Sequence, residues 1–116
     1  MIHEFRRARR RKAADTILVT DAMTDRVFGR LGNLSQTGML LIASEPLTDD
    51  ALYQFRFDLP GQERDRNPVD VGAHLLWQDH TSAPGHSWAG FRFIAMPEAH
   101  ALRIHHWIEA PGGHYE

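Results

Sequence analysis

Two short segments of the chain carry residue types that could bind a nucleotide. The first is an arginine-rich run at residues 6–12, which contains Arg6, Arg7, Arg9, Arg10, Arg11 and Lys12. Arginine is permanently charged and presents its N–H donors in a planar fork, so it can hold a phosphate, bind the O6/N7 edge of guanine or stack on a base. Two arginines four residues apart on a bent segment could hold one nucleotide by different faces. The run offers two such pairs, Arg6 with Arg10 and Arg7 with Arg11.

The second segment is Asn33-Leu34-Ser35-Gln36-Thr37-Gly38. In an extended chain Asn33 and Ser35 share one face, while Leu34 points to the other. The Asn33 carbonyl can accept a hydrogen bond from guanine N1–H or N2–H, and the Ser35 hydroxyl can donate and accept. Gly38 permits a positive φ or a close backbone approach. Taken with the arginine run, this segment predicts a site for a phosphate-rich guanine ligand.

Each segment also has a plainer interpretation. A run of arginines is typical of a solvated tail or of an arm that binds polyanions without specificity, and Asn, Ser and Gly are the usual residues of hairpin turns. The charge distribution favours a small anion over a nucleic acid. The formal net charge is −2, and because six of the thirteen Lys and Arg residues lie in the run, the rest of the chain carries −8. Nucleic-acid binders are usually basic over a broad face.

Alternating apolar residues predict the elements that must position these segments. We expect strands over residues 15–21, 26–34, 39–43, 53–59, 69–77 and 88–94, with turns at 21–25 and 81–85 and a loop at 60–68. Six strands at hairpin-like spacing indicate an antiparallel barrel or sandwich. A helix is expected between Pro97 and Pro111. Its apolar face could pack on the barrel, plug its mouth or bind a partner helix; that face consists of Ala101, Ile104, Trp107 and Ile108.

Trp77 is a further candidate contact, because an aromatic ring can stack on guanine. It shares the alternation of Val71 and Leu75, however, so the pattern favours a core position unless a bulge at Gly72 reverses the face of the strand. Arg92 has the opposite parity to its phenylalanine neighbours and is expected to face solvent.

Composition excludes several classes of function. The 116 residues contain no cysteine, and the longest apolar run, residues 39–43, is far too short to span a membrane. No apolar stretch follows the basic N-terminus as in a signal peptide, so a cytoplasmic protein is expected. The eight histidines lack the spacing of a zinc helix, and neither a Gly-x-Ser-x-Gly nucleophile motif nor a lysine-bearing phosphate loop is present. Neither a metal site nor catalysis is expected.

The combined pattern resembles the PilZ domain, a bacterial receptor for cyclic di-GMP. An Arg-x-x-x-Arg pair, a strand pair and Asn-x-Ser-x-x-Gly lead into Met39-Leu40-Leu41-Ile42. Similar strands follow at Ala73-His74-Leu75-Leu76-Trp77 and Ala89-Gly90-Phe91-Arg92-Phe93, so the resemblance covers nearly the whole chain. It implies a six-stranded antiparallel β-barrel with a C-terminal α-helix over residues 15–110. A flexible basic N-terminal arm would precede it at residues 1–14, and a tail would follow at 111–116.

The resemblance also implies a ligand, cyclic di-GMP, and a set of residues that bind it. These are Arg7, Arg11, Asn33, Ser35 and Gly38, with Arg6, Arg10 and Trp77 as further candidates. Arg6 with Arg10 forms the competing register; the spacing from Arg11 to Asn33 favours Arg7 with Arg11. Asn33 stands where the family frequently has aspartate, and the loss of a charge-assisted bond could lower the affinity by about 1 kcal/mol.

The implied function is that of an adaptor. Binding would order the arm and change the conformation of the protein, which would then signal to a separate protein in motility, exopolysaccharide or virulence control. No cofactor beyond the ligand is expected. Two alternatives stay open, a protein-interaction adaptor of the same fold that binds no nucleotide, and a nucleic-acid-binding barrel with a basic arm.

Overall fold

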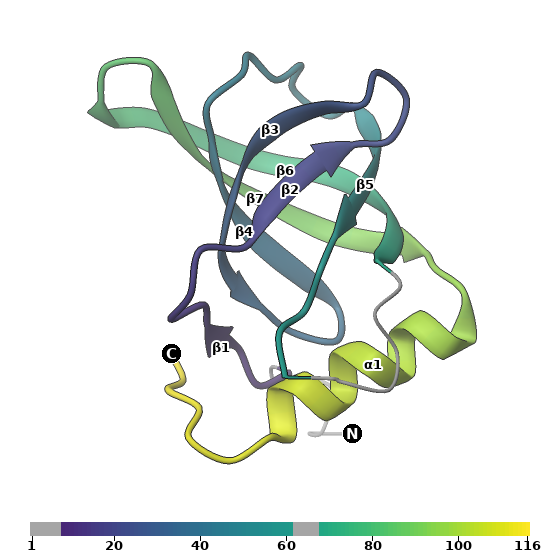
Figure 1. Cartoon of the computed structure of the whole chain (residues 1–116). Helices are drawn as coiled ribbons and strands as arrows, with labels where there is room; N and C mark the ends of the chain where they lie inside the picture. The colour runs from purple at the N-terminus through teal and green to yellow at the C-terminus, as the bar shows by residue number, and fades with distance from the viewer. Residues whose placement is uncertain (1–7, 62–67) are drawn as a thin grey trace, which may run out of the picture.

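The computed structural model describes residues 8–61 and 68–116, apart from the side chains of residues 81–83. These residues form seven strands and one helix (Figure 1). The elements are β1 (Arg11–Lys12), β2 (Leu18–Asp21), β3 (Arg26–Leu34), β4 (Gly38–Ala43), β5 (Leu52–Phe57), β6 (Val69–Ala83), β7 (His86–Ala95) and α1 (Glu98–Glu109).

Six of the strands close into an antiparallel barrel. The order around it is β3, β2, β5, β6, β7 and β4, and β4 pairs back with β3 to close the ring. Closure gives the strand edges partners, which an open sheet would leave exposed. The predicted six-stranded antiparallel β-barrel with a C-terminal helix is therefore confirmed. The short strand β1 was not predicted; it joins the edge of β3 through the pairs Arg11↔Leu34 and Lys12↔Asn33.

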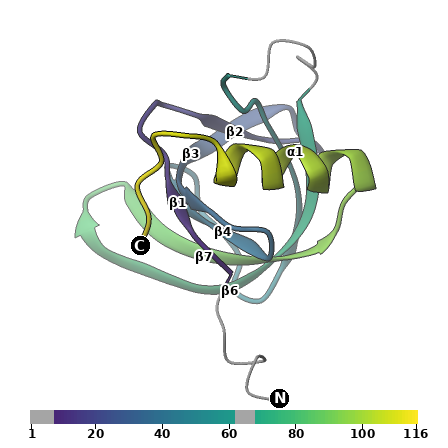
Figure 2. The same ribbon diagram turned by 90° about the horizontal axis from the view of Figure 1, so that it is seen from below.

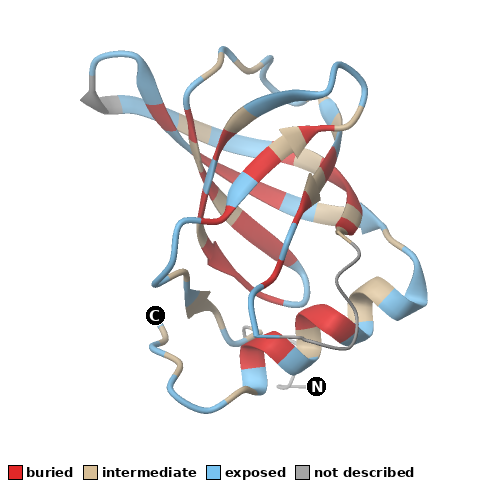
Figure 3. Cartoon of the chain, viewed as in Figure 1, coloured by how far each residue is buried: buried red, intermediate tan, exposed pale blue. Residues whose placement is uncertain are grey.

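The core lies inside the barrel, and buried residues recur along the strands that form its wall (Figure 3). Phe55 and Phe91 are buried at its centre with their rings edge to face, 5.1 Å between centroids. Phe28 and Tyr53 pack against them from the partly buried rim. This aromatic cluster explains the alternation in β5, because every second side chain of a strand must fill the barrel interior.

Helix α1 lies across one end of the barrel (Figures 1 and 2). Ile104, Trp107 and Ile108 are 0–5% exposed and turn toward the core, whereas Leu102 on the other side is 54% exposed. The predicted apolar face thus packs on the barrel of its own chain. In the part of the chain that the structure describes, no helix is long and apolar enough to cross a membrane.

Trp77 is not a core residue, so the expectation from alternation is wrong at this position. Trp77 is 50% exposed. The pairs Leu75↔Phe91 and Trp77↔Gly90 leave one extra residue, Leu76, in β6, and this bulge turns Trp77 outward. The irregularity at Gly72 does not change the face of β6, because there the extra residue lies in β7. Arg92 is exposed, as expected.

Candidate functional site

The two predicted segments meet where β1 lies beside the end of β3. The Arg10 guanidinium donates from Nη1 to Asn33 Oδ1 at 2.9 Å. Asn33 is 4% exposed, and Arg10 is half-buried. Arg10 and Asn33 are 23 positions apart in the sequence. They come together because β2 and β3 form a hairpin, so that the end of β3 lies beside β1. One arginine of the run and the asparagine of the motif are therefore direct neighbours.

A cavity of about 350 Å³ opens beside this pair. Its wall combines a cation, an amide, a carboxylate and two indole rings; its residues are Arg10, Asn33, Met39, Leu40, Leu76, Trp77, Trp88, Gly90, Phe91 and Glu116. The Trp77 ring lies over Gly90, because a Cβ built on Gly90 would be 2.2 Å from Trp77 Nε1. The bulge at Leu76 thus places an aromatic face where a planar base could stack.

Ser35 and Gly38 shape the loop between β3 and β4. Ser35 is fully buried, and its Oγ accepts hydrogen bonds from the backbone N–H groups of Thr37 at 3.2 Å and Gly38 at 3.1 Å. Gly38 lies so close to β7 that an added Cβ would be 2.2 Å from the backbone oxygen of Phe91. Of the predicted motif residues, Asn33 lines the cavity, whereas Ser35 and Gly38 hold the backbone that follows it.

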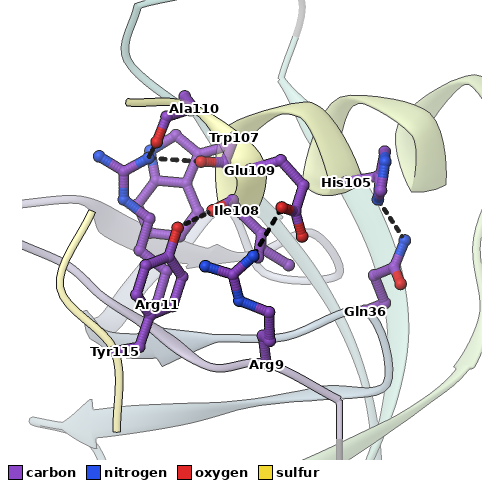
Figure 4. A network of polar contacts seen from close by, with 9 residues as sticks. All are labelled: Arg9, Arg11, Gln36, His105, Trp107, Ile108, Glu109, Ala110 and Tyr115. Carbon is purple, nitrogen blue, oxygen red and sulfur yellow. Dashed lines mark hydrogen bonds and ion pairs between the residues drawn. The ribbon is translucent and has the colours of Figure 1, made fainter. Parts of the chain in front are cut away.

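Arg9 and Arg11 do not line this cavity and instead contact the C-terminal end of α1 (Figure 4). Arg11 Nη1 donates to the carbonyl oxygens of Trp107 at 2.5 Å and Ala110 at 3.3 Å, and its guanidinium lies 4.7 Å from the centre of the Trp107 ring. The last carbonyls of a helix lack partners within the helix and attract cations. Arg9 pairs with Glu109 at 2.7 Å. Arg9 and Arg11 therefore contact the end of α1, whereas Arg10, which lies between them in the sequence, contacts Asn33.

This geometry bears on the two registers. Arg6 and Arg7 lie outside the described residues, so each register is represented by its second arginine. Arg10 contacts Asn33, whereas Arg11 contacts the helix end. Alternation along an extended chain predicts that neighbouring arginines diverge, but not which of them faces Asn33. The preference for Arg7 with Arg11 stays a prediction, and the contacts favour the pair Arg6 with Arg10.

The segment after α1 returns to β1 and reaches the cavity. Lys12 N donates to His114 O at 2.8 Å, and Glu116 N donates to Arg10 O at 3.1 Å. The Asn33 side-chain amide donates from Nδ2 to the Glu116 carboxylate. The Tyr115 hydroxyl donates to the Ile108 carbonyl oxygen and anchors the segment on the helix. Sequence reasoning missed Glu116, because residues 111–116 carry no motif.

A larger cavity, about 450 Å³, lies elsewhere, between the end of α1, the connection from β1 to β2 and residues 60–61 after β5. Its wall includes Arg11, Ile17 and Trp107. The Arg11 guanidinium already forms hydrogen bonds with the carbonyls of Trp107 and Ala110 there, so the smaller cavity is the stronger candidate for a ligand site. Within residues 8–61 and 68–116, no group of three or more His, Asp or Glu side chains is arranged to hold a metal ion.

Comparison with known protein families identifies the family of this chain. The PilZ domain model matches residues 4–110. The chain belongs to the PilZ domain family. PilZ domains are non-catalytic domains.

Solved structures share this PilZ fold at low sequence identity. The PilZ domain of YcgR from Escherichia coli, solved with c-di-GMP, is 18% identical, with a TM-score of 0.65 over 90% of this chain and 88% of that one. YcgR from Escherichia coli in complex with c-di-GMP is also 18% identical, with a TM-score of 0.69 over 90% of this chain and 44% of that one. The Bacillus subtilis inhibitor of motility MotI/DgrA is 11% identical, with a TM-score of 0.68 over 86% of this chain and 47% of that one. The chain thus spans less than half of the last two proteins. A comparison with curated proteins gives no match.

Proposed function

We propose that this PilZ domain is a receptor for cyclic di-GMP that changes conformation on binding and signals to a partner protein. The observation that carries the proposal is the hydrogen-bonded pair of Arg10 and Asn33 at a cavity that Trp77 also lines. A guanidinium fork can bind the O6/N7 edge of guanine or a phosphate, and an indole can stack on the base. The family membership and the shared fold with the E. coli domain solved with c-di-GMP support it.

The proposed site residues divide into contacts and supports. Arg10 and Asn33 contact the ligand, with Trp77 stacking on a guanine, and Arg6 is the partner arginine four residues before Arg10. Ser35 and Gly38 support the loop that carries Asn33. The alternative register, Arg7 with Arg11, would require Arg11 to leave two helix carbonyls and the Trp107 ring.

The conformational response follows from the two faces of β1. A ligand that binds Arg10, the residue immediately before β1, exerts its force on the strand that presents Arg11 to the end of α1. A shift of β1 therefore changes the clamp on the helix end, and with it the surface formed by α1 and residues 111–116. Such an element has two arrangements, and the ligand favours one of them. The partner recognises that surface; motility, exopolysaccharide and virulence systems are the candidate pathways.

Calorimetry on the folded protein tests the proposal, with cyclic di-GMP, GTP and a DNA oligomer as separate ligands. We expect heat with cyclic di-GMP at micromolar protein and none with the others, and a large loss of affinity in Arg10→Ala. The absence of heat with an intact fold would contradict the receptor and favour a protein-interaction adaptor. Binding of DNA with a steep salt dependence would instead indicate a nucleic-acid-binding barrel.

A further inference from the structure

Glu116 is the one carboxylate among the residues that line the cavity beside Arg10 and Asn33. Both its backbone and its side chain form hydrogen bonds with neighbouring residues. Its backbone N–H donates to the Arg10 carbonyl oxygen at 3.1 Å, and its side chain accepts from Asn33 Nδ2. The segment also pairs with β1 through Arg11↔Tyr115. In Figure 1 the C-terminus accordingly lies next to β1, far in sequence but close in space.

Both polar atoms of the Asn33 side-chain amide form hydrogen bonds. Its Oδ1 accepts from Arg10, and its Nδ2 donates to Glu116. Asn33 is also only 4% exposed. With these bonds in place, Asn33 orients its two charged neighbours, and its carbonyl is directed at Arg10. The cavity then needs another acceptor for a guanine base, and a carboxylate has about four lone-pair sites, of which the bond from Asn33 uses one.

Guanine has a complementary pattern of donors and acceptors. Its O6 and N7 are acceptors, which suit the Arg10 fork, and its N1–H and N2–H₂ are adjacent donors, which suit a carboxylate. Adenine lacks the N1–H donor, and hypoxanthine lacks the N2 amino group. A cation, an anion and an exposed indole around one cavity therefore form a set that distinguishes guanine from these bases.

Building on the proposed function, we propose that Glu116 is a specificity-determining residue that accepts hydrogen bonds from guanine N1–H and N2–H₂ of cyclic di-GMP, with Asn33 as its positioning residue. The competing role for the same carboxylate is exclusion, in which Glu116 fills the site and repels the ligand phosphates. The two roles predict opposite signs when the charge of residue 116 is removed.

The test compares cyclic di-GMP with cyclic di-IMP, whose hypoxanthine bases lack the N2 amino group. Calorimetry is performed on the wild-type protein and on Glu116→Gln, which keeps the size of the side chain and removes its charge. We expect the wild-type protein to prefer cyclic di-GMP by about tenfold, the scale of a hydrogen bond to a charged group. In Glu116→Gln, the affinity for cyclic di-GMP should fall about tenfold and the preference should largely disappear.

Glu98→Gln is the matched control, because it removes the same charge from an exposed residue in the first turn of α1. It should leave both affinities unchanged. Tighter binding of cyclic di-GMP by Glu116→Gln would establish exclusion and overturn the proposal. Unchanged affinity, or an equal loss for both ligands, would also overturn it. If the wild-type protein binds no cyclic di-GMP, the receptor proposal itself fails; if it binds and only the preference is unaffected by Glu116→Gln, the assignment of Glu116 alone fails.

Discussion

The Trp77 indole covers Gly90, and an added Cβ at Gly90 would come within 2.2 Å of Trp77 Nε1. Gly90 is buried for this reason, although it lies on the outer face of β7. The absence of a side chain at one residue thus determines where an exposed aromatic ring can rest on the barrel.

Gly90→Ala should therefore displace the Trp77 ring from the cavity wall. The ring is half-exposed and can move, so we expect little loss of stability but a loss of ligand stacking of about 1–3 kcal/mol. Calorimetry with cyclic di-GMP measures the loss, and Trp77→Ala should show the same effect. Normal binding by both variants would mean that the ring takes no part in recognition.

Replacing either of two neighbouring arginines should separate ligand binding from stability. Arg10→Ala should weaken binding of cyclic di-GMP with little change in the free energy of unfolding. Arg11→Ala should lower that free energy by about 1–2 kcal/mol, because the last carbonyls of α1 and the Trp107 ring lose their cation. Urea unfolding and calorimetry on both variants provide the measurement. The opposite pattern would favour the register of Arg7 with Arg11.

Ser35→Ala should destabilise the protein before any ligand is added. The buried hydroxyl accepts from two backbone N–H groups, and its removal leaves them without that partner, at a cost of about 1–3 kcal/mol. Thermal unfolding of the ligand-free protein detects this loss. Ser44→Ala is the control, since it removes a hydroxyl from an exposed residue. An unchanged melting temperature in Ser35→Ala would indicate a role in direct ligand contact instead.

Gly38→Ala should be more damaging, because the new methyl group would meet the backbone oxygen of Phe91 at 2.2 Å. Backbone within a paired strand cannot move aside without opening the β4–β7 ladder, so we expect a loss of more than about 2 kcal/mol in urea unfolding. Gly72→Ala is a suitable control, since its Cβ would have no neighbour closer than 3.4 Å. Equal stability of the two variants would contradict this account.

Much of the barrel could be predicted from sequence because β-strands bury every second residue. The limits 26–34 predicted for one strand coincide with β3, and the helix was placed within a residue or two of its ends. Trp77 was placed wrongly because a single extra residue, Leu76, reverses the face of a strand. The strand β1 escaped prediction because two residues have no periodicity, and its pairing depends on β3, which is distant in sequence.

The candidate site was predictable only in part. Asn33 could be identified because an asparagine before a Ser-x-x-Gly turn has a recognisable pattern. The orientation of the arginines depends on how β1 pairs, which no local pattern encodes. Glu116 reaches the cavity through contacts with Arg10 and Asn33, both more than eighty residues away along the chain.

The two-residue length of β1 has a consequence for how the protein opens. Segments held by few hydrogen bonds open locally at a much lower free energy than the whole fold. The amide hydrogens of Lys12 and Glu116, which join β1 to the returning segment, should therefore exchange with solvent far faster than those at the centre of β5 or β6. The proposed ligand site can therefore open and re-form while the barrel stays folded.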